Sequence, residues 1–209
     1  MNYRKQLSKV ILAAIIGIVG TTQAHAVGLG FSVGTGSETW SNDIGYNGDR
    51  DVSNFGFLVD TAVSRNKTFS YRFTFMKEKN TAKGSGVDLE GYATIHDFGF
   101  AVLNTKEVRL WLGPELKAGI YKNVSFSDSN IDFNGDASGF GVGPAIGVNV
   151  NLPRVVSFSF TAAYYFLSAY SGNYDNYGTN STNGYYSGSF DVDSNGLYLT
   201  ASIIFRIHE

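Results

Sequence analysis

The sequence predicts an all-β fold, in which eight antiparallel strands form an up-and-down meander that closes into a transmembrane barrel. Eight stretches alternate between large apolar residues and small or polar ones, as strands between lipid and a lumen do. The chain is rich in Gly (25), Phe (16) and Tyr (13), and only 16% of it is charged. After the N-terminal segment no apolar run is long enough for a spanning helix, which leaves a closed sheet as the way to satisfy the backbone in lipid.

The N-terminus has the three parts of a secretory signal. Three basic residues precede the apolar run at 10–20, and Ala24-His25-Ala26 supplies the small-residue ending. We expect cleavage after Ala26, so that residues 1–26 are a signal peptide and residues 27–209 form the barrel domain. The alternative, an uncleaved anchor, needs about 20 apolar residues, more than this run provides.

Composition removes several classes of function. The signal carries three of the 16 basic residues and none of the 18 acidic ones, which leaves 13 against 18 and a net charge of −5. The sequence has no run of basic residues that would predict a nucleic-acid partner. The absence of Cys excludes disulfides, thiol nucleophiles and thiolate metal sites.

The first three strands are expected within 27–36, 54–64 and 69–76, where alternate residues are apolar. Their other faces carry Gly and Ser in the first stretch, Asp60 in the second and Arg72 in the third. The apolar faces, which should contact lipid, comprise Leu29, Phe31, Val33, Phe55, Phe57, Val59, Phe69, Tyr71, Phe73 and Phe75.

The fourth stretch, 91–103, supports two conflicting alternations. The face that holds Phe98 and Phe100 places Asp97 inward and His96 toward lipid, whereas the face that holds Ala93 and Ile95 places Asp97 in the hydrocarbon. A β-bulge adds one residue and shifts the alternation. We therefore expect a bulge between Ile95 and Phe98.

The last four strands are expected within 108–121, 139–149, 156–166 and 197–206. The fifth directs charged and aromatic residues inward, whereas the inner face of the sixth consists mainly of Gly. The apolar faces comprise Val108, Leu110, Leu112, Leu116, Ile120, Phe140, Val142, Ile146, Val148, Val156, Phe158, Phe160, Tyr164, Phe166, Leu197, Leu199, Ala201, Ile203 and Phe205.

The links between the stretches alternate in length. Those at 65–68, 104–107 and 151–154 are short, and the others are longer, above all 171–189. Outer-membrane barrels have short periplasmic turns and long extracellular loops. The pattern predicts an even number of strands, both termini in the periplasm and four loops outside.

The whole stretch from residue 27 onward resembles the small outer-membrane barrels of the OmpA transmembrane-domain, OmpX and opacity-protein type. The resemblance rests on the alternating strands, the pairs Gly113-Pro114 and Gly143-Pro144, and the closing GLYLTASIIF at 196–205. It implies residence in a Gram-negative outer membrane and delivery to the barrel-assembly machinery through the last strand. Such strands usually end on an aromatic residue, but this chain runs four residues past Phe205.

An eight-stranded barrel is wide enough only for its own side chains. Charged groups in that space must be paired or hydrated, so we expect a salt-bridge network that plugs the lumen; the alternative is a gate or narrow polar pathway. The glycine-lined faces leave room for bulky residues from the third to fifth strands or for water. The inward polar set is Asp60, Arg72, Asp97, Arg109, Trp111, Glu115 and Lys117.

Catalytic and metal patterns are weak. His96 is followed by Asp97 and lacks the His-x-Ser arrangement of lipid A deacylase barrels, so we expect a structural or interfacial histidine there. The calcium-like spacing that begins at Asp191 and Asp193 has Ser202 at its twelfth position, which favours turn chemistry. We expect no catalytic residue, metal or cofactor.

Tyrosines in the last long link are interleaved with Asn, Gly and Ser, a mixture that binding loops use. Tyr174, Tyr177, Tyr185 and Tyr186 are the candidate contacts with an unknown surface ligand, although they could instead rest on the lipopolysaccharide layer. The expected function is that of a non-enzymatic outer-membrane surface protein with lipid and lipopolysaccharide as partners. The alternatives are a narrow channel and a lipid A- or phospholipid-modifying enzyme.

Overall fold

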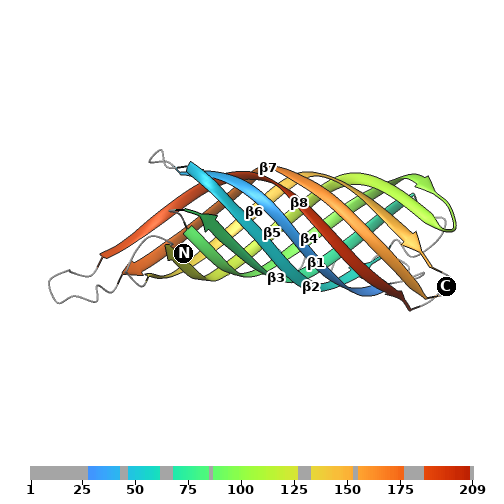
Figure 1. Ribbon diagram of the computed structural model, residues 1–209, viewed down its shortest axis with the longest axis horizontal. Coiled ribbons are helices and arrows are strands. Elements are labelled where there is room, and N and C mark those ends of the chain that lie inside the picture. The colour runs from blue at the N-terminus through green and yellow to red at the C-terminus, as the bar shows by residue number, and fades with distance from the viewer. Residues whose placement is uncertain are drawn as a thin grey trace, which may run out of the picture.

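The computed structural model describes residues 28–42, 47–61, 68–84, 87–126, 133–152, 155–176 and 186–207, and all of their regular structure is strand. Eight antiparallel strands follow one another around a closed barrel (Figure 1). Among these residues no helix has the length and apolar character needed to cross a membrane. The strands are β1 (Gly28–Asn42), β2 (Asn47–Asp60), β3 (Phe69–Lys83), β4 (Val87–Asn104), β5 (Val108–Phe126), β6 (Phe133–Asn151), β7 (Val156–Asn176) and β8 (Tyr186–Arg206).

The barrel closes where β1 pairs with β8, from Gly28 opposite Arg206 to Asn42 opposite Val192. The start of β1 and the end of β8 therefore lie at the same end of the barrel, at the right in Figure 1. We call it the terminal end; the opposite end, which carries the links β1–β2, β3–β4, β5–β6 and β7–β8, is the loop end. Closure leaves no free strand edge, as a bilayer requires.

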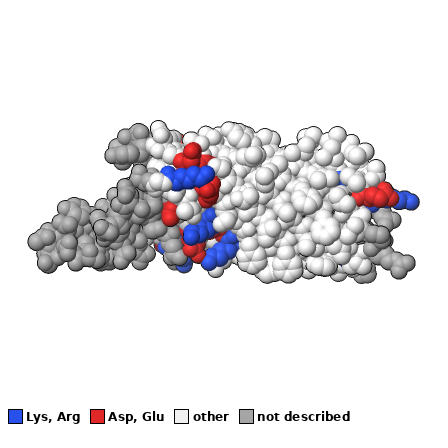
Figure 2. Space-filling view, viewed as in Figure 1, with Lys and Arg blue, Asp and Glu red and all other residues white. Residues whose placement is uncertain are grey.

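A belt of apolar side chains surrounds the barrel on its outer face. These side chains are about half exposed; Phe57 is 57% exposed and Ile120 is 63% exposed. In Figure 2 a broad charge-free zone separates a group of charged residues toward the loop end from a smaller group at the terminal end. Exposure of such a large apolar surface to water would be unfavourable, whereas contact with lipid hydrocarbon is favourable. The belt therefore marks the segment that lies in the bilayer.

The expectation of a bulge between Ile95 and Phe98 is wrong. The register of β3 against β4 runs without interruption from Asn80 opposite Leu89 to Phe69 opposite Phe100. Ile95 and Asp97 share the inner face, and the shifts against β5 lie farther out, between Glu90 and Gly91 and between Ala101 and Leu103.

The misassignment has a simple cause: the face that holds Ala93 and Ile95 is apolar because it packs inside the barrel. Ala93 and Ile95 are both buried and form an interior cluster with Met76. An apolar residue in such a strand therefore does not by itself mark the lipid side.

The long links expected at the loop end are mostly strand. The links β1–β2, β3–β4, β5–β6 and β7–β8 are residues 43–46, 84–86, 127–132 and 177–185, whereas β2–β3, β4–β5 and β6–β7 are 61–68, 105–107 and 152–155. The expected alternation of short and long links is thus absent, because the strands continue well beyond the apolar belt. Figure 1 shows β7 and β8 among the strands that reach farthest at this end.

The sheet is irregular at the level of the two Gly-Pro pairs. Pro114 and Pro144 lie directly opposite each other in β5 and β6, and neither can donate a backbone hydrogen bond. In β7 the registers against β6 and β8 both shift by one residue in the same region. Phe166 and Leu167 are both exposed there, so a bulge in β7 turns two successive apolar side chains to lipid.

Candidate functional site: the barrel lumen

The half of the lumen toward the loop end is organised around two buried carboxylates. Glu38 on β1 forms a 2.6 Å salt bridge with Arg50 on β2 and accepts hydrogen bonds from the hydroxyls of Tyr170 and Tyr198. The guanidinium of Arg50 also lies 4.5 Å from the ring centroid of Tyr170. One carboxylate thus joins the four consecutive strands β7, β8, β1 and β2.

Glu78 is the second of these carboxylates and has no exposed surface. Its Oε1 lies 2.7 Å from Nζ of Lys117 and accepts a 2.6 Å hydrogen bond from the hydroxyl of Tyr121. Lys117 also donates to the hydroxyl of Tyr198 at 3.0 Å, which connects the two carboxylate clusters. Paired and hydrogen-bonded in this way, the charges avoid the large cost of isolated burial.

The terminal half of the lumen contains a third ion pair, between Arg72 and Asp60. Two guanidinium nitrogens, Nε at 2.9 Å and Nη2 at 2.6 Å, donate to the same carboxylate oxygen. Arg72 also donates to Thr161 and to Asn149, which lie on the opposite wall of the barrel. Arg109 lies at this end with its Nη2 3.5 Å from the carbonyl of Thr68.

Between these clusters, Asp97 and Glu115 face each other across β4 and β5. Both side chains are buried, with exposed fractions of 5% and 4%. The hydroxyl of Tyr165 donates to Oε1 of Glu115. This group continues the polar contacts between the loop-end and terminal-end clusters.

Aromatic rings cover much of the glycine-lined wall. A Cβ placed on Gly147 would lie 2.4 Å from the ring of Trp111, and one on Gly139 would lie 2.5 Å from the ring of Tyr170. Gly141 lies against Tyr165 in the same way. These rings come from β5 and β7, so the space left by the glycines is filled with side chains.

The structure places all seven residues of the inward polar set inside the barrel, each at most 5% exposed: Asp60, Arg72, Asp97, Arg109, Trp111, Glu115 and Lys117. Sequence analysis missed Glu38, Arg50 and Glu78, which hold the loop-end network. They lie where the strands have left the belt and the outward residues are polar as well. The available signal was a period-two pattern of size and charge, for example Glu38 and Trp40 between Ser37, Thr39 and Ser41.

His96 lies on the outer face, where its Nδ1 is 2.7 Å from the hydroxyl of Tyr71. Asp97, its neighbour in the chain, points into the lumen, so the two side chains are on opposite sides of the wall. The arrangement therefore gives His96 an aromatic environment beside Tyr71 and Phe73 within the apolar belt, with no acidic partner from Asp97.

Two of the four candidate contact tyrosines belong to strands. Tyr174 lies on β7, opposite Gly188, and Tyr186 begins β8, opposite Asn176. Tyr177 and Tyr185 lie outside the described residues. The expected contact surface is therefore at least partly the end of a β-hairpin.

The acidic residues with calcium-like spacing also lie on a strand. Asp191 and Asp193 are exposed positions of β8, where side chains on one face are spaced along an extended backbone. Among the described residues no group of three or more acidic or His side chains could hold a metal ion.

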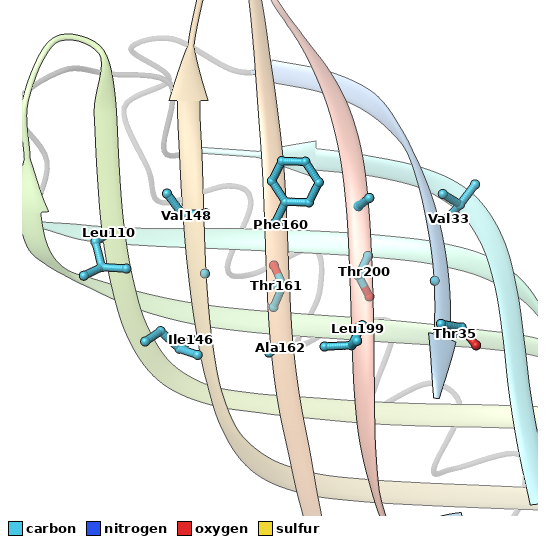
Figure 3. Close-up of a pocket in the computed structure, with 13 residues that line it drawn as sticks. Val33, Thr35, Leu110, Ile146, Val148, Phe160, Thr161, Ala162, Leu199 and Thr200 are labelled. Carbon is cyan, nitrogen blue, oxygen red and sulfur yellow. The ribbon is translucent and has the colours of Figure 1, made fainter. Parts of the chain in front are cut away.

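A groove lies on the lipid-facing surface over β6, β7 and β8, with a cavity volume of about 730 Å³. Figure 3 shows Phe160 and Leu199 beside the small Ala162, with Ile146 and Val148 on one side. The lining is almost wholly apolar and belongs to the belt. The groove thus suits packing of hydrocarbon chains against the barrel wall.

Comparison with solved structures identifies the fold. The chain is similar to the outer membrane protein OprG from Pseudomonas aeruginosa, with a TM-score of 0.52 and 10% identity over 88% of this chain and 95% of that one. Neisserial surface protein A gives a TM-score of 0.44 and 14% identity over 87% and 98% of the two chains. The outer membrane protease OmpT from Escherichia coli gives 0.47 and 9% over 88% and 98%. No family model and no curated protein matches the sequence.

Closed antiparallel topology, an apolar outer belt and a polar filled interior define a transmembrane β-barrel of the outer-membrane class. Within that class the chain is a small barrel with eight strands. The likeness to OprG shows the fold alone, so the function has to be argued from the lumen and the surface of this chain.

Proposed function

We propose that the protein is a non-enzymatic structural and surface-contact barrel of the Gram-negative outer membrane, exported by its signal peptide and oriented with the terminal end in the periplasm. The belt inserts into the bilayer, and closure of the sheet satisfies the backbone there. The strands beyond the belt carry contact surfaces outside the cell. The candidate tyrosines near the β7–β8 link would take part in that contact.

The network that crosses the lumen is the observation that supports this proposal. Three ion pairs lie in the lumen at two levels, Glu38–Arg50, Glu78–Lys117 and Asp60–Arg72. Hydrogen bonds from Arg72 and Lys117 then reach strands on the far wall. Tyr121, Tyr165, Tyr170 and Tyr198 fill the space around them and are each at most 2% exposed. A solute would have to break several of these contacts at once. The interior therefore favours a structural barrel with a sealed lumen over a narrow channel.

Single-channel recording in planar bilayers tests the proposal against the narrow channel. The folded protein should give a flat trace under voltage, because the ion pairs and rings block the path. Steady ohmic conductance that scales with the number of inserted barrels would contradict a sealed lumen.

A variant that opens the lumen makes the flat trace informative. Tyr121→Ala with Tyr170→Ala removes two buried rings that contact each other, with centroids 5.6 Å apart. If that variant folds and conducts while the native barrel stays silent, the recording was sensitive enough. A matched pair of outward substitutions, Phe57→Ala with Phe160→Ala, should leave the trace flat.

A further inference from the structure

Lysines are unevenly distributed around the outer face of the loop half. Among the described residues there, every outward-facing basic side chain belongs to β3 or β5: Lys77, Lys79, Lys83 and Lys122. The outward charges described on β2, β6 and β8 are all acidic, at Asp49, Asp51, Asp136, Asp191 and Asp193. Strand β4, between β3 and β5, carries the outward carboxylates Asp88 and Glu90. The sector of β3, β4 and β5 is therefore basic overall, whereas the rest of the described rim is neutral or acidic.

The basic sector begins directly where the apolar belt ends. On β3, β4 and β5 the last apolar outward residues are Phe75, Tyr92 and Ile120. The next outward position on each strand is charged, namely Lys77, Glu90 and Lys122. This is the level at which lipid headgroups meet the barrel, and Figure 2 shows mixed charge gathered next to the charge-free belt.

Glu90 lies next to two of these lysines. Its Oε1 lies 2.6 Å from Nζ of Lys77, and Lys79 is its direct partner in the β3–β4 register. The pKa of Glu90 lies below its usual value, chiefly because Lys77 hydrogen-bonds to the carboxylate, with the charge of Lys79 adding to the effect.

A β-bulge brings the third lysine to the same place. In the β4–β5 register Gly91 pairs with Tyr121 and Glu90 pairs with Asn123, so Lys122 is the extra residue. Bulges redirect side chains at the rims of barrels. Lys77 and Lys79 on β3 and Lys122 on β5, which we call the lysine patch, thus lie on either side of Glu90 on β4. The three lysines and Glu90 together carry two positive charges in excess.

The surface just below the patch suits acyl chains. Phe75 and Tyr92 stack with ring centroids 5.6 Å apart and an interplanar angle of 8°, and Ile120 is 63% exposed beside them. A ligand that combines an anionic headgroup with hydrocarbon would contact both levels at once.

We propose that the lysine patch binds a phosphate group of the phosphorylated, acylated glycolipid of the outer leaflet, whose chains lie on Phe75, Tyr92 and Ile120. This inference rests on the proposed function, because it needs the loop end to face the outer leaflet. Lys77 is held by Glu90, and Lys79 and Lys122 complete the set of ammonium donors around the phosphate. The glycolipid becomes a fixed partner of one side of the barrel.

Native mass spectrometry of the detergent-solubilised barrel tests the site with three probes: bis-phosphorylated lipid A, the same lipid A without phosphates, and phosphatidylglycerol. The native protein should retain bis-phosphorylated lipid A in preference to both other probes. The triple variant Lys77→Gln, Lys79→Gln, Lys122→Gln should weaken that binding on the order of a hundredfold, at roughly fivefold per lysine near an anionic surface.

The control variant Lys83→Gln with Lys106→Gln changes exposed lysines outside the patch and should bind as the native protein does. Glu90→Gln should strengthen binding, because it removes the negative charge at the centre. Equal retention by the native and triple-variant barrels, or native preference for phosphatidylglycerol, would overturn the inference. Heat-modifiable migration on a denaturing gel shows whether each variant forms a folded barrel. A folded barrel without selectivity for lipid A contradicts the lysine patch and leaves the proposed function standing, whereas a protein that forms no barrel contradicts the proposed function.

Discussion

Lys117 shows what a charged residue does inside this barrel. It is 3% exposed and lies within 6.0 Å of the rings of Tyr165, Tyr170 and Tyr198. Its ammonium group compensates Glu78 and also reaches the hydroxyl that binds Glu38. The residue therefore ties the two loop-end carboxylates into one network, and its removal should be felt by both.

Lys117→Met should destabilise the barrel by about 3–5 kcal/mol, because it leaves the Glu78 carboxylate buried without its cation. Urea unfolding in lipid vesicles, followed by tryptophan fluorescence, measures the difference. The double variant Lys117→Met with Glu78→Gln should recover much of the loss, since no uncompensated charge remains. A single variant as stable as the native barrel would show that the ion pair has no structural role.

Gly147→Ala should destabilise the barrel by about 1–3 kcal/mol through overpacking, because the new Cβ would lie 2.4 Å from the ring of Trp111. Gly141→Ala on the same strand and face is the matched control, since its Cβ would meet Tyr165 at 3.1 Å. The same unfolding assay should rank the two variants in that order. A larger cost at Gly141 would contradict the packing described for this wall.

At the scale of the element, β7 shows how a strand of 21 residues stays in phase with the lipid. Ser157, Ser159 and Thr161 face inward below the bulge, whereas Ser168 and Tyr170 face inward above it. Without the extra residue at 166–167 one half of the strand would present its polar face to hydrocarbon. The bulge is thus a requirement of this particular sequence.

Deletion of Leu167 should be tolerated, because removing one bulged residue makes the registers of β7 against both β6 and β8 continuous. Deletion of Phe160 should prevent folding, since it flips the inward and outward faces of the strand below that point. Heat-modifiable migration after refolding into vesicles reports both outcomes. Equal folding of the two deletions would show that β7 has no fixed register.

Sequence reasoning succeeded for strands in the belt and failed beyond it, for a physical reason. In the bilayer the outer face must be apolar, so hydrophobicity alternates with period two, as along β8 from Leu197 to Phe205. Above the belt both faces are polar, and the alternation that predicts a strand disappears, although the ladder continues through Glu38 and Arg50. Sequence alone therefore predicts loops in those segments and does not reveal their inward charges.

The prediction for the fourth strand, β4, failed for the opposite reason. Its inner face is partly apolar, with Ala93 and Ile95 packed on Met76, so hydrophobicity no longer distinguishes lumen from lipid. Only the pairing with β3 fixes the side on which each residue lies, and pairing partners are not visible along a single strand.

For the whole molecule, the apolar belt and the filled lumen have a common consequence: the wall separates hydrocarbon from a packed polar interior. Outward positions of β8 alternate with buried inward ones, such as Tyr198 and Ile204, through the full thickness of the belt. The chain has no Cys, so each position can be probed singly without a background thiol.

Ala201→Arg should cost about 2–4 kcal/mol, whereas Asn195→Arg, just beyond the belt on the same strand, should cost at most about 1 kcal/mol. The first places a guanidinium in hydrocarbon and the second places it near headgroups. Unfolding in vesicles of defined thickness measures both, and the gap should narrow in thinner bilayers. Equal costs would mean that Ala201 does not face lipid.

The most direct test of the central claim is spin-label accessibility along β8, with single Cys substitutions from 197 to 206 in the folded protein in vesicles. Labels at the odd positions should collide with lipid-soluble oxygen and not with a water-soluble nickel complex, because they face hydrocarbon. Labels at the even positions should be protected from both, because they lie in a packed lumen. Nickel access at the even positions would show a water-filled channel, and nickel access at the odd positions would show that the barrel does not span the bilayer.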